Sequence, residues 1–321
     1  MQRIYNKQIE KRKEKLKMGI KLFSHNDLDG VSPYILLRTY FQQEQIHYTF
    51  CNYDDIDEKV KKFLDTKEYL TYDKIYITDI SISEGLAERL QKIANDNKIE
   101  LRLFDHHATA VNLNKFEFCS VIPKKNSELI CGTKLFYEYL ITEKKLQEKK
   151  YIAEYVKYVN DYDTWLWETK YHYNTPNEWN TLFYFYGRVN FIENVLKKFE
   201  KKKIDFTETD KLILDVEARK KKSYIQAKLK EVIKKEIDNY LCAIVFAESY
   251  TNDLATKMKE SFSEADILII IGSKGISYRC RDDKDIHLGE FAKKFGGGGH
   301  PKAAGSQITS KMREQMIACI F

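Results

Sequence analysis

The residues best suited to chemistry lie in four short clusters of acidic and histidine side chains. In chain order they are residues 24–30 (SHNDLDG), Asp79, residues 105–107 (DHH) and residues 161–163 (DYD). Carboxylate oxygens and imidazole nitrogens are ligands that suit hard or borderline divalent ions such as Mn²⁺ or Mg²⁺. The six cysteines form no CxxC pair, so neither a structural zinc site nor a disulfide framework is expected.

Each cluster taken alone also has an ordinary structural explanation. Asp29 suits a helix cap, Gly30 suits a tight turn, and Asp79 is one aspartate at the end of an apolar run. A pair of adjacent histidines can be exposed and inert, and residues 161–163 can form an acidic loop. Each explanation is plausible for its own cluster, but it is much less plausible that all four hold at once. The four clusters are therefore predicted to form one site.

Hydrophobic patterning predicts the elements that would position these clusters. Apolar runs predict strands at 20–24, 46–53, 74–78, 99–104 and 116–122. Helical spacing predicts helices at 1–18, 31–41, 60–64, 84–95, 132–140 and 151–160. This alternation favours an α/β fold with a mostly parallel sheet and flanking helices. Because ligands bind beyond the carboxyl ends of such strands, the clusters that follow strands 20–24, 74–78 and 99–104 are expected to converge.

The second half of the chain predicts a connector and a smaller α/β domain. Residues 210–238 read as one long charged helix. Beyond it the pattern predicts strands at 241–247, 266–271 and 276–280 and a helix at 288–295. The predicted organisation is an N-terminal domain at 1–200, a helical connector at 201–238 and a C-terminal domain at 239–321.

A run of four glycines and a histidine, residues 296–300, follows the last of these predicted helices. The backbone N–H groups of such a run can form an anion-binding nest, and His300 can bond a phosphate or a base edge. Arg279, on the preceding strand, can clamp a phosphate through two hydrogen bonds. A flexible linker is the alternative, but the alanine-rich segment 303–305 that follows favours a functional role.

Composition limits the class of protein. A chain of 321 residues is long enough for two domains. It has no apolar run of about eighteen residues and its N-terminus lacks the apolar core of a secretory signal, so no membrane partner is expected. The scattered cysteines predict reduced thiols in a cytoplasmic protein. Lys and Arg number 54 against 48 Asp and Glu, which is compatible with a polyanionic substrate without demonstrating one.

The order of these motifs resembles that of the DHH phosphoesterase superfamily. The segments that carry the resemblance are SHNDLDG (24–30), TDIS (78–81), DHH (105–107), NDYDTW (160–165) and GGGGHPKAAG (296–305). The resemblance covers residues 19–308 and implies a DHH catalytic domain followed by a DHH-associated substrate-binding domain. It also implies two Mn²⁺ ions, with Mg²⁺ or Co²⁺ as alternatives.

Residue by residue, the resemblance makes His25 and Asp27 ligands of one ion, and Asp29 and His107 ligands of the other. Asp79 would bridge both ions. Asp79 and His107 are also implied to be catalytic.

The fourth acidic motif is implied to supply one more ligand. Asp161 and Asp163 both fit this role, and Asp163 is preferred. His106 would lie beside the metals as a catalytic residue that orients a ligand or the leaving oxygen. The substrate-binding residues implied in the second domain are Arg279, Gly297, Gly298, Gly299 and His300.

A chain with only these two domains resembles the oligoribonuclease, or nanoRNase, members of the superfamily. The resemblance therefore implies a metal-dependent phosphodiesterase that releases nucleoside monophosphates from short single-stranded RNA or DNA oligonucleotides; a homodimer is left open. Alternatives are a RecJ-like single-strand exonuclease and a hydrolase of linear or cyclic dinucleotides or of 3′-phosphoadenosine-5′-phosphate. A non-catalytic nucleotide-binding module is an alternative of another class, which the intact ligand set disfavours.

Overall fold

The computed structural model describes residues 19–281 and 283–321, and the predicted helix at 1–18 lies outside this part. The chain divides into two compact units between Leu214 and Asp215. That division falls inside the segment 201–238, which the sequence assigns to a connector. Both units combine helices with a sheet, which confirms the predicted α/β class. Within the described residues, no helix combines the length and the apolar character that crossing a membrane requires.

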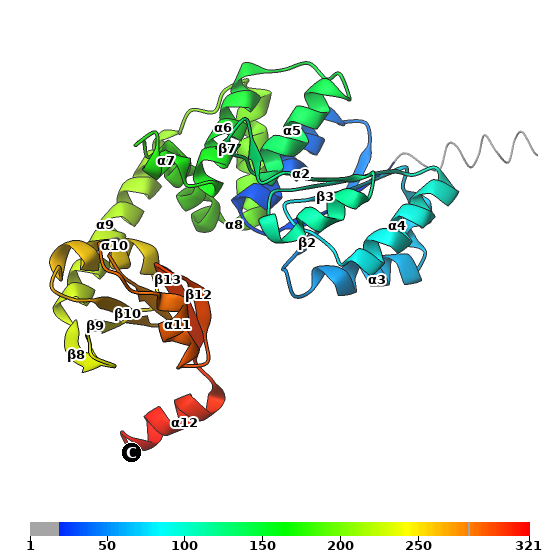
Figure 1. Cartoon of the computed structure of the whole chain (residues 1–321). Helices are drawn as coiled ribbons and strands as arrows, with labels where there is room; N and C mark the ends of the chain where they lie inside the picture. The colour runs from blue at the N-terminus through cyan, green and yellow to red at the C-terminus, as the bar shows by residue number, and fades with distance from the viewer. Residues whose placement is uncertain (1–18, 282) are drawn as a thin grey trace, which may run out of the picture. The chain divides into compact units, whose positions relative to one another are not determined.

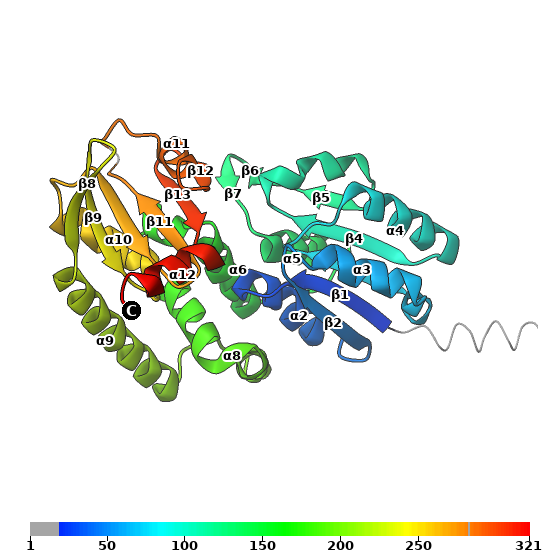
Figure 2. The ribbon, with the colours of Figure 1, turned by 90° about the horizontal axis from the view of Figure 1, so that it is seen from below.

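The first unit is built on a five-stranded sheet in the order β2-β1-β3-β4-β5. All neighbouring strands are parallel, as predicted. Figure 2 shows the sheet running from β2 and β1 at one edge to β5 at the other. The strands are β1 (Gly19–His25), β2 (Gln45–Cys51), β3 (Lys74–Thr78), β4 (Glu100–Asp105) and β5 (Cys119–Val121).

Helices cover both faces of this sheet (Figure 1). One face carries α2 (Leu28–Tyr40), α5 (Gly132–Thr142), α6 (Lys150–Asp163) and α8 (Thr175–Glu200), and the other carries α3 (Ile56–Asp65) and α4 (Glu84–Asn97). Strand residues alternate between the two cores, since Ile75 and Ile77 pack on the α3–α4 side and Tyr76 on the opposite side. The shorter elements are η1 (Glu68–Thr71), η2 (Ala108–Lys115), β6 (Lys124–Lys125), β7 (Glu128–Leu129) and α7 (Leu166–Thr169).

Helix α8 was not predicted. Its segment has apolar and aromatic side chains around most of the helix instead of a single stripe, so the helical period is obscured. Trp179 and Phe191 are buried in the core on this side of the sheet. The helix is interrupted at Gly187, where φ is +67°.

The second unit contains a six-stranded sheet in the order β12-β13-β11-β10-β9-β8. Strands β9 and β10 are parallel and the other neighbouring pairs are antiparallel. The strands are β8 (Ile233–Ile237), β9 (Tyr240–Phe246), β10 (Ile267–Ile271), β11 (Gly275–Arg279), β12 (Gly298–His300) and β13 (Ala303–Gln307). The helices are α9 (Glu208–Lys230), which crosses the division between the units, α10 (Thr251–Ser261), α11 (Leu288–Lys293) and α12 (Ser310–Ala318).

The predicted helix at 210–238 is wrong in its last turns. Helix α9 ends at Lys230, and the next residues form strand β8. Asp238 and Asn239 both have positive φ, +53° and +65°, and join β8 to β9. Two such residues between antiparallel strands are typical of a tight hairpin. The Asp-Asn pair was therefore the signal for a strand that the helical reading missed.

We predict that Gly30→Ala destabilises the first unit, because a methyl group there would lie 2.1 Å from the backbone carbonyl oxygen of His25. The loss should be about 1–3 kcal/mol or more. Gly85→Ala, in the first turn of α4, is the matched control, because nothing lies within 4 Å of its added methyl. It should leave stability unchanged or raise it by about 0.5–1 kcal/mol.

The measurement is the urea midpoint followed by tryptophan fluorescence, since all three tryptophans belong to the first unit. Equal midpoints for the two variants would contradict the close contact at Gly30.

Candidate metal centre

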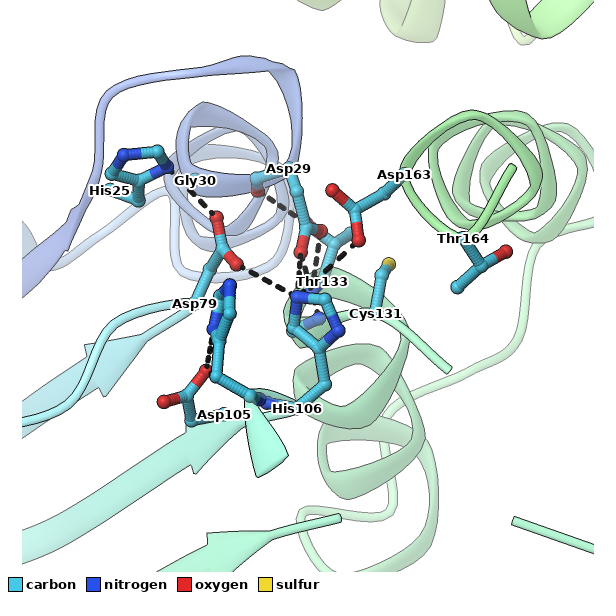
Figure 3. Close-up of polar contacts among 12 residues, drawn as sticks. His25, Asp29, Gly30, Asp79, Asp105, His106, Cys131, Thr133, Asp163 and Thr164 are labelled. Atoms are coloured by element: carbon cyan, nitrogen blue, oxygen red, sulfur yellow. Dashed lines mark hydrogen bonds and ion pairs between the residues drawn. The ribbon is translucent and has the colours of Figure 1, made fainter. Parts of the chain in front are cut away.

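Three adjacent strands deliver the acidic and histidine clusters to one edge of the first sheet. Strand β1 ends at His25, β4 ends at Asp105, and Asp79 directly follows β3, which lies between them. The last helical residue of α6, Asp163, meets the same edge (Figure 3). The predicted convergence of these clusters is therefore what the structure contains.

The first group of possible ligands is His25, Asp27 and Asp79. The Nδ1 atom of His25 lies 2.9 Å from Asp27 Oδ2 and 3.6 Å from Asp79 Oδ2. Asp27 also caps α2, accepting a hydrogen bond from the backbone N–H of Gly30 at 2.9 Å. One carboxylate oxygen of Asp27 therefore caps the helix, while the other faces His25.

The second group is Asp29, His106 and Asp163. The Nε2 atom of His106 lies 3.3 Å from Asp163 Oδ2 and 3.9 Å from Asp29 Oδ2. The same Nε2 is 3.3 Å from Oδ1 of Asp79, whose other oxygen faces His25. Asp79 therefore lies between the two groups, with one carboxylate oxygen toward each.

Four of these buried atoms have no hydrogen-bond partner among the described residues. They are His25 Nδ1, Asp79 Oδ2, His106 Nε2 and Asp163 Oδ2. Buried polar atoms nearly always have a partner, and leaving one unpaired is costly. Two imidazoles and four carboxylates that point inward form an oxygen- and nitrogen-rich ligand set. This set fits divalent cations.

The charges in the cluster lead to the same interpretation. Burial, together with the negative charges of Asp29 and Asp27, raises the pKa of Asp79 well above its usual range. The pKa of Asp163 is raised by the same causes. Burial also acts to raise the pKa of Asp27, but its bond with His25 lowers that pKa overall. A bound cation would relieve the repulsion that these carboxylates exert on one another.

Asp29 is held by the first turn of α5, a contribution that sequence reasoning missed. Its carboxylate accepts hydrogen bonds from the backbone N–H groups of Gly132 and Thr133, both at 2.8 Å. A side chain at Gly132 would come within 2.8 Å of the Cα atom of Asp79. The sequence predicts that a helix begins at residue 132. It does not indicate that the N-terminus of this helix faces the sheet edge where the acidic clusters lie.

The two histidines of the DHH motif make different contacts. His106, not His107, is the histidine that lies against Asp29 and Asp163. The Nδ1 atom of His107 bonds Asp105 Oδ1 at 2.7 Å, and the two residues form a further group of possible ligands with Asp79 and His106. Its Nε2 lies 3.0 Å from the hydroxyl of Tyr53.

Asp105 is well placed to hold His107 in this orientation. Its carboxylate also accepts hydrogen bonds from the Ser81 hydroxyl at 2.5 Å and from the His106 backbone N–H at 2.8 Å. The bond with Asp105 raises the pKa of His107, whereas burial lowers the pKa of His106. His107 is therefore the better proton donor of the pair, and His106 the better neutral ligand.

Of the two candidates in the fourth motif, the structure brings only Asp163 to the cluster. Asp161 is buried and bonded to Lys157 Nζ and to the Tyr173 hydroxyl, both at 2.5 Å. The two aspartates occupy positions i and i+2 of α6, and such positions do not share a helix face. Asp161 is thus placed to stabilise the helix and the segment around Tyr173.

The predicted substrate-binding residues of the second unit separate into two groups. Arg279, Gly298 and Gly299 line a pocket of about 580 Å³, whereas Gly297 and His300 do not. The Arg279 guanidinium bonds the carbonyl of Tyr278 at 3.0 Å and Asn252 Oδ1 at 3.2 Å. Neither partner is a carboxylate, and burial lowers the pKa of Arg279. This charge is available to an anionic ligand.

The glycine run forms part of an edge strand rather than a loop. Residues Gly298–His300 are β12 and pair with β13. A side chain at Gly297 would lie 2.1 Å from the carbonyl oxygen of Gly305, and one at Gly299 would lie 2.6 Å from Ala304 Cα. Close packing of backbones explains these two glycines without a ligand.

Comparison with known proteins agrees with this geometry. A model of the DHHA1 domain matches residues 238–320. Oligoribonuclease NrnB of Bacillus subtilis (strain 168) is 31% identical over 306 residues, which cover 94% of this chain and 75% of that protein. The chain belongs to the DHH phosphoesterase superfamily. This membership confirms the resemblance inferred from the motifs.

Two solved structures of this superfamily's fold are also similar. The pGpG-specific phosphodiesterase PggH from Vibrio cholerae matches with a TM-score of 0.54 and 14% identity, covering 94% of this chain and 97% of that one. Exonuclease RecJ bound to manganese matches with a TM-score of 0.57 and 13% identity, covering 95% and 90% of the two chains. At these identities the similarity describes the fold alone.

We predict that Asp79→Asn raises the thermal stability of the metal-free protein and removes its stabilisation by Mn²⁺. The substitution deletes a charge from a repelling cluster, and asparagine tolerates the φ of +57° at this position. The gain should be about 1–2 kcal/mol. Thermal unfolding with chelator and with Mn²⁺ provides the measurement. An Asp79→Asn protein that Mn²⁺ stabilises as much as the wild type would contradict the central position of Asp79.

Proposed function

We propose that this protein is a metal-dependent phosphodiesterase that hydrolyses short single-stranded RNA or DNA oligonucleotides to nucleoside monophosphates. The observation that carries the proposal is the inward-facing set of buried, unpartnered ligand atoms at the sheet edge. A relative that is 31% identical over most of this chain is named an oligoribonuclease, and this supports the choice of substrate class. The six cysteines are unpaired, as expected of an enzyme in the cytoplasm.

The centre would hold two divalent ions, with Mn²⁺ as the first choice and Mg²⁺ or Co²⁺ as alternatives. His25 and Asp27 would bind one ion, Asp29, His106 and Asp163 would bind the other, and Asp79 would bridge them. When bound, such ions activate water and stabilise the charge of the transferring phosphoryl group. These two sets correspond to two of the three groups of possible ligands in the structure, and the third joins Asp79 and His106 with Asp105 and His107.

The protein's own groups supply the remaining steps. Asp105 holds the Nδ1–H of His107, so that the Nε2 edge of the ring is oriented. From that edge His107 can donate a proton to a phosphate oxygen or to the leaving oxygen. The N–H groups of Gly132 and Thr133 hold the carboxylate of Asp29 in its orientation by donating hydrogen bonds to it.

The test is product analysis with the full chain on 5′-phosphorylated oligonucleotides from two to about 25 nucleotides, a range that spans known single-strand site sizes. With Mn²⁺ we expect mononucleotide release, fastest on the shortest substrates, and no release after exhaustive chelation. Turnover that survives chelation would contradict the metal centre. Faster turnover of long strands than of dinucleotides would favour the RecJ-like exonuclease.

The two aspartates of α6 provide a matched pair for the same assay. Asp163→Asn should lower kcat more than about a hundredfold, because loss of even an outer-shell partner costs about 10- to 100-fold. Asp161→Asn should lower stability, because it weakens the bonds to Lys157 and Tyr173, while the folded enzyme keeps most of its kcat. The reverse order of kcat losses would contradict the assignment of Asp163.

We further propose that Arg279 binds a phosphate of the substrate away from the bond that is cut. Arg279→Ala should raise KM for a dinucleotide by about 10- to 150-fold, the equivalent of one charge-assisted hydrogen bond. Arg281→Ala is the control, since that guanidinium is already paired with Asp283 at 2.9 Å. Hydrolysis of a small activated phosphodiester should be unchanged by Arg279→Ala. An equal loss on both substrates would contradict this division of roles.

A further inference from the structure

A large exposed aromatic side chain stands directly beside the buried metal centre. Tyr53 is 60% exposed, although its ring centroid lies 4.8 Å from that of His25 and 5.5 Å from that of His107. One part of the ring packs on these two histidines and the rest faces solvent. Such a ring is a ready surface for another flat group.

The loop that carries Tyr53 is fixed by its neighbours. The side chain of Asn52 bonds that of Asn26, which lies in the loop between β1 and α2. The backbone N–H of Asn52 also donates to Asp55 Oδ1 at 2.8 Å, and Asp55 in turn pairs with Lys59 at 2.7 Å. The position of the Tyr53 ring is therefore built into the structure before any ligand arrives.

The hydroxyl of Tyr53 is anchored as well. It lies 3.0 Å from Nε2 of His107, whose other nitrogen is held by Asp105. The ring is thus placed at the side of the centre where His107 would meet a phosphate. A nucleotide whose phosphate lies at the centre would bring its ribose and base within reach of this ring.

A second exposed aromatic residue lies near the same carboxylates. Tyr184 on α8 is 70% exposed. It is close enough to Asp27 for that charge to contribute, after burial, to raising the pKa of its phenol. Of these two exposed tyrosines, Tyr53 is the one whose ring contacts the histidines of the centre. Base stacking on such rings is independent of base identity, because every base has a π face.

We propose that Tyr53 is a substrate-binding residue, whose ring stacks on the base of the nucleotide held at the metal centre. This inference rests on the proposed function and adds to it a binding site for a nucleobase in the first unit. It explains an exposed ring that the fold does not need for its core. It predicts a preference for nucleotides over phosphate esters without a base at this centre.

The experiment compares the binding of AMP and of ribose 5-phosphate to the full chain in the presence of Mn²⁺. AMP is a product of the proposed reaction, so no turnover occurs during the titration. For the wild type we expect AMP to bind about 5- to 150-fold more tightly than ribose 5-phosphate, the range equivalent to one stacked base. Repeating both titrations in Arg279→Ala protein removes the anion-binding group of the second unit.

Variants of Tyr53 identify the ring as the cause. Tyr53→Leu should abolish the preference for AMP, whereas Tyr53→Phe and Tyr53→Trp should keep it, because they keep a flat ring. Tyr48→Leu is the control, since Tyr48 is also exposed, at 41%, and precedes the same loop on β2. Equal affinities for the two ligands in the wild type, or an unchanged preference in Tyr53→Leu, would overturn the proposal. Failure of the proposed function would instead appear as absent hydrolysis of dinucleotides with Mn²⁺.

Discussion

The repulsion among several buried carboxylates is the constraint on which the rest of the first unit depends. Asp29 and Asp79 are 2% and 1% exposed, and Asp163 shares the same small volume. The fold opposes this negative charge with helix N-termini: Asp27 caps the N-terminus of α2, and α5 directs two N–H groups at Asp29. Helix N-termini favour negative charge. The helices that cover the sheet therefore also stabilise the negative charge of the centre.

Close backbone approach is the second requirement of the site. Asp79 takes a φ of +57°, a conformation that few residues other than glycine adopt. Gly132 lets α5 pass within contact distance of its backbone, and Gly30 does the same for the carbonyl of His25. Ser24 links these segments, because its hydroxyl bonds Gly30 O at 2.6 Å and lies 2.7 Å from Thr78 Oγ1. The packing around Asp79 thus maintains its strained backbone conformation.

Much of this arrangement can be predicted from the sequence, because the residues that follow parallel strands all lie at the same edge of the sheet. Apolar runs predict the strands, and that rule then predicts the convergence of His25, Asp79 and residues 105–107. It does not predict which of the two adjacent histidines lies against Asp29 and Asp163, since Asp105 holds the other through a hydrogen bond. Helix geometry does separate Asp161 from Asp163, but only once α6 is known to extend through both.

The glycine run shows how packing and binding can be told apart within one motif. Gly296 has a φ of +72°, and Gly297 and Gly299 lie against the backbone of the neighbouring strand. The fold alone explains these three residues. Gly298 differs, because its φ is not positive and no atom lies within 4 Å of an added methyl. It lines the pocket that holds Arg279. Packing therefore does not require glycine there, and the missing side chain leaves the backbone of β12 accessible to the anionic ligand that we propose for Arg279.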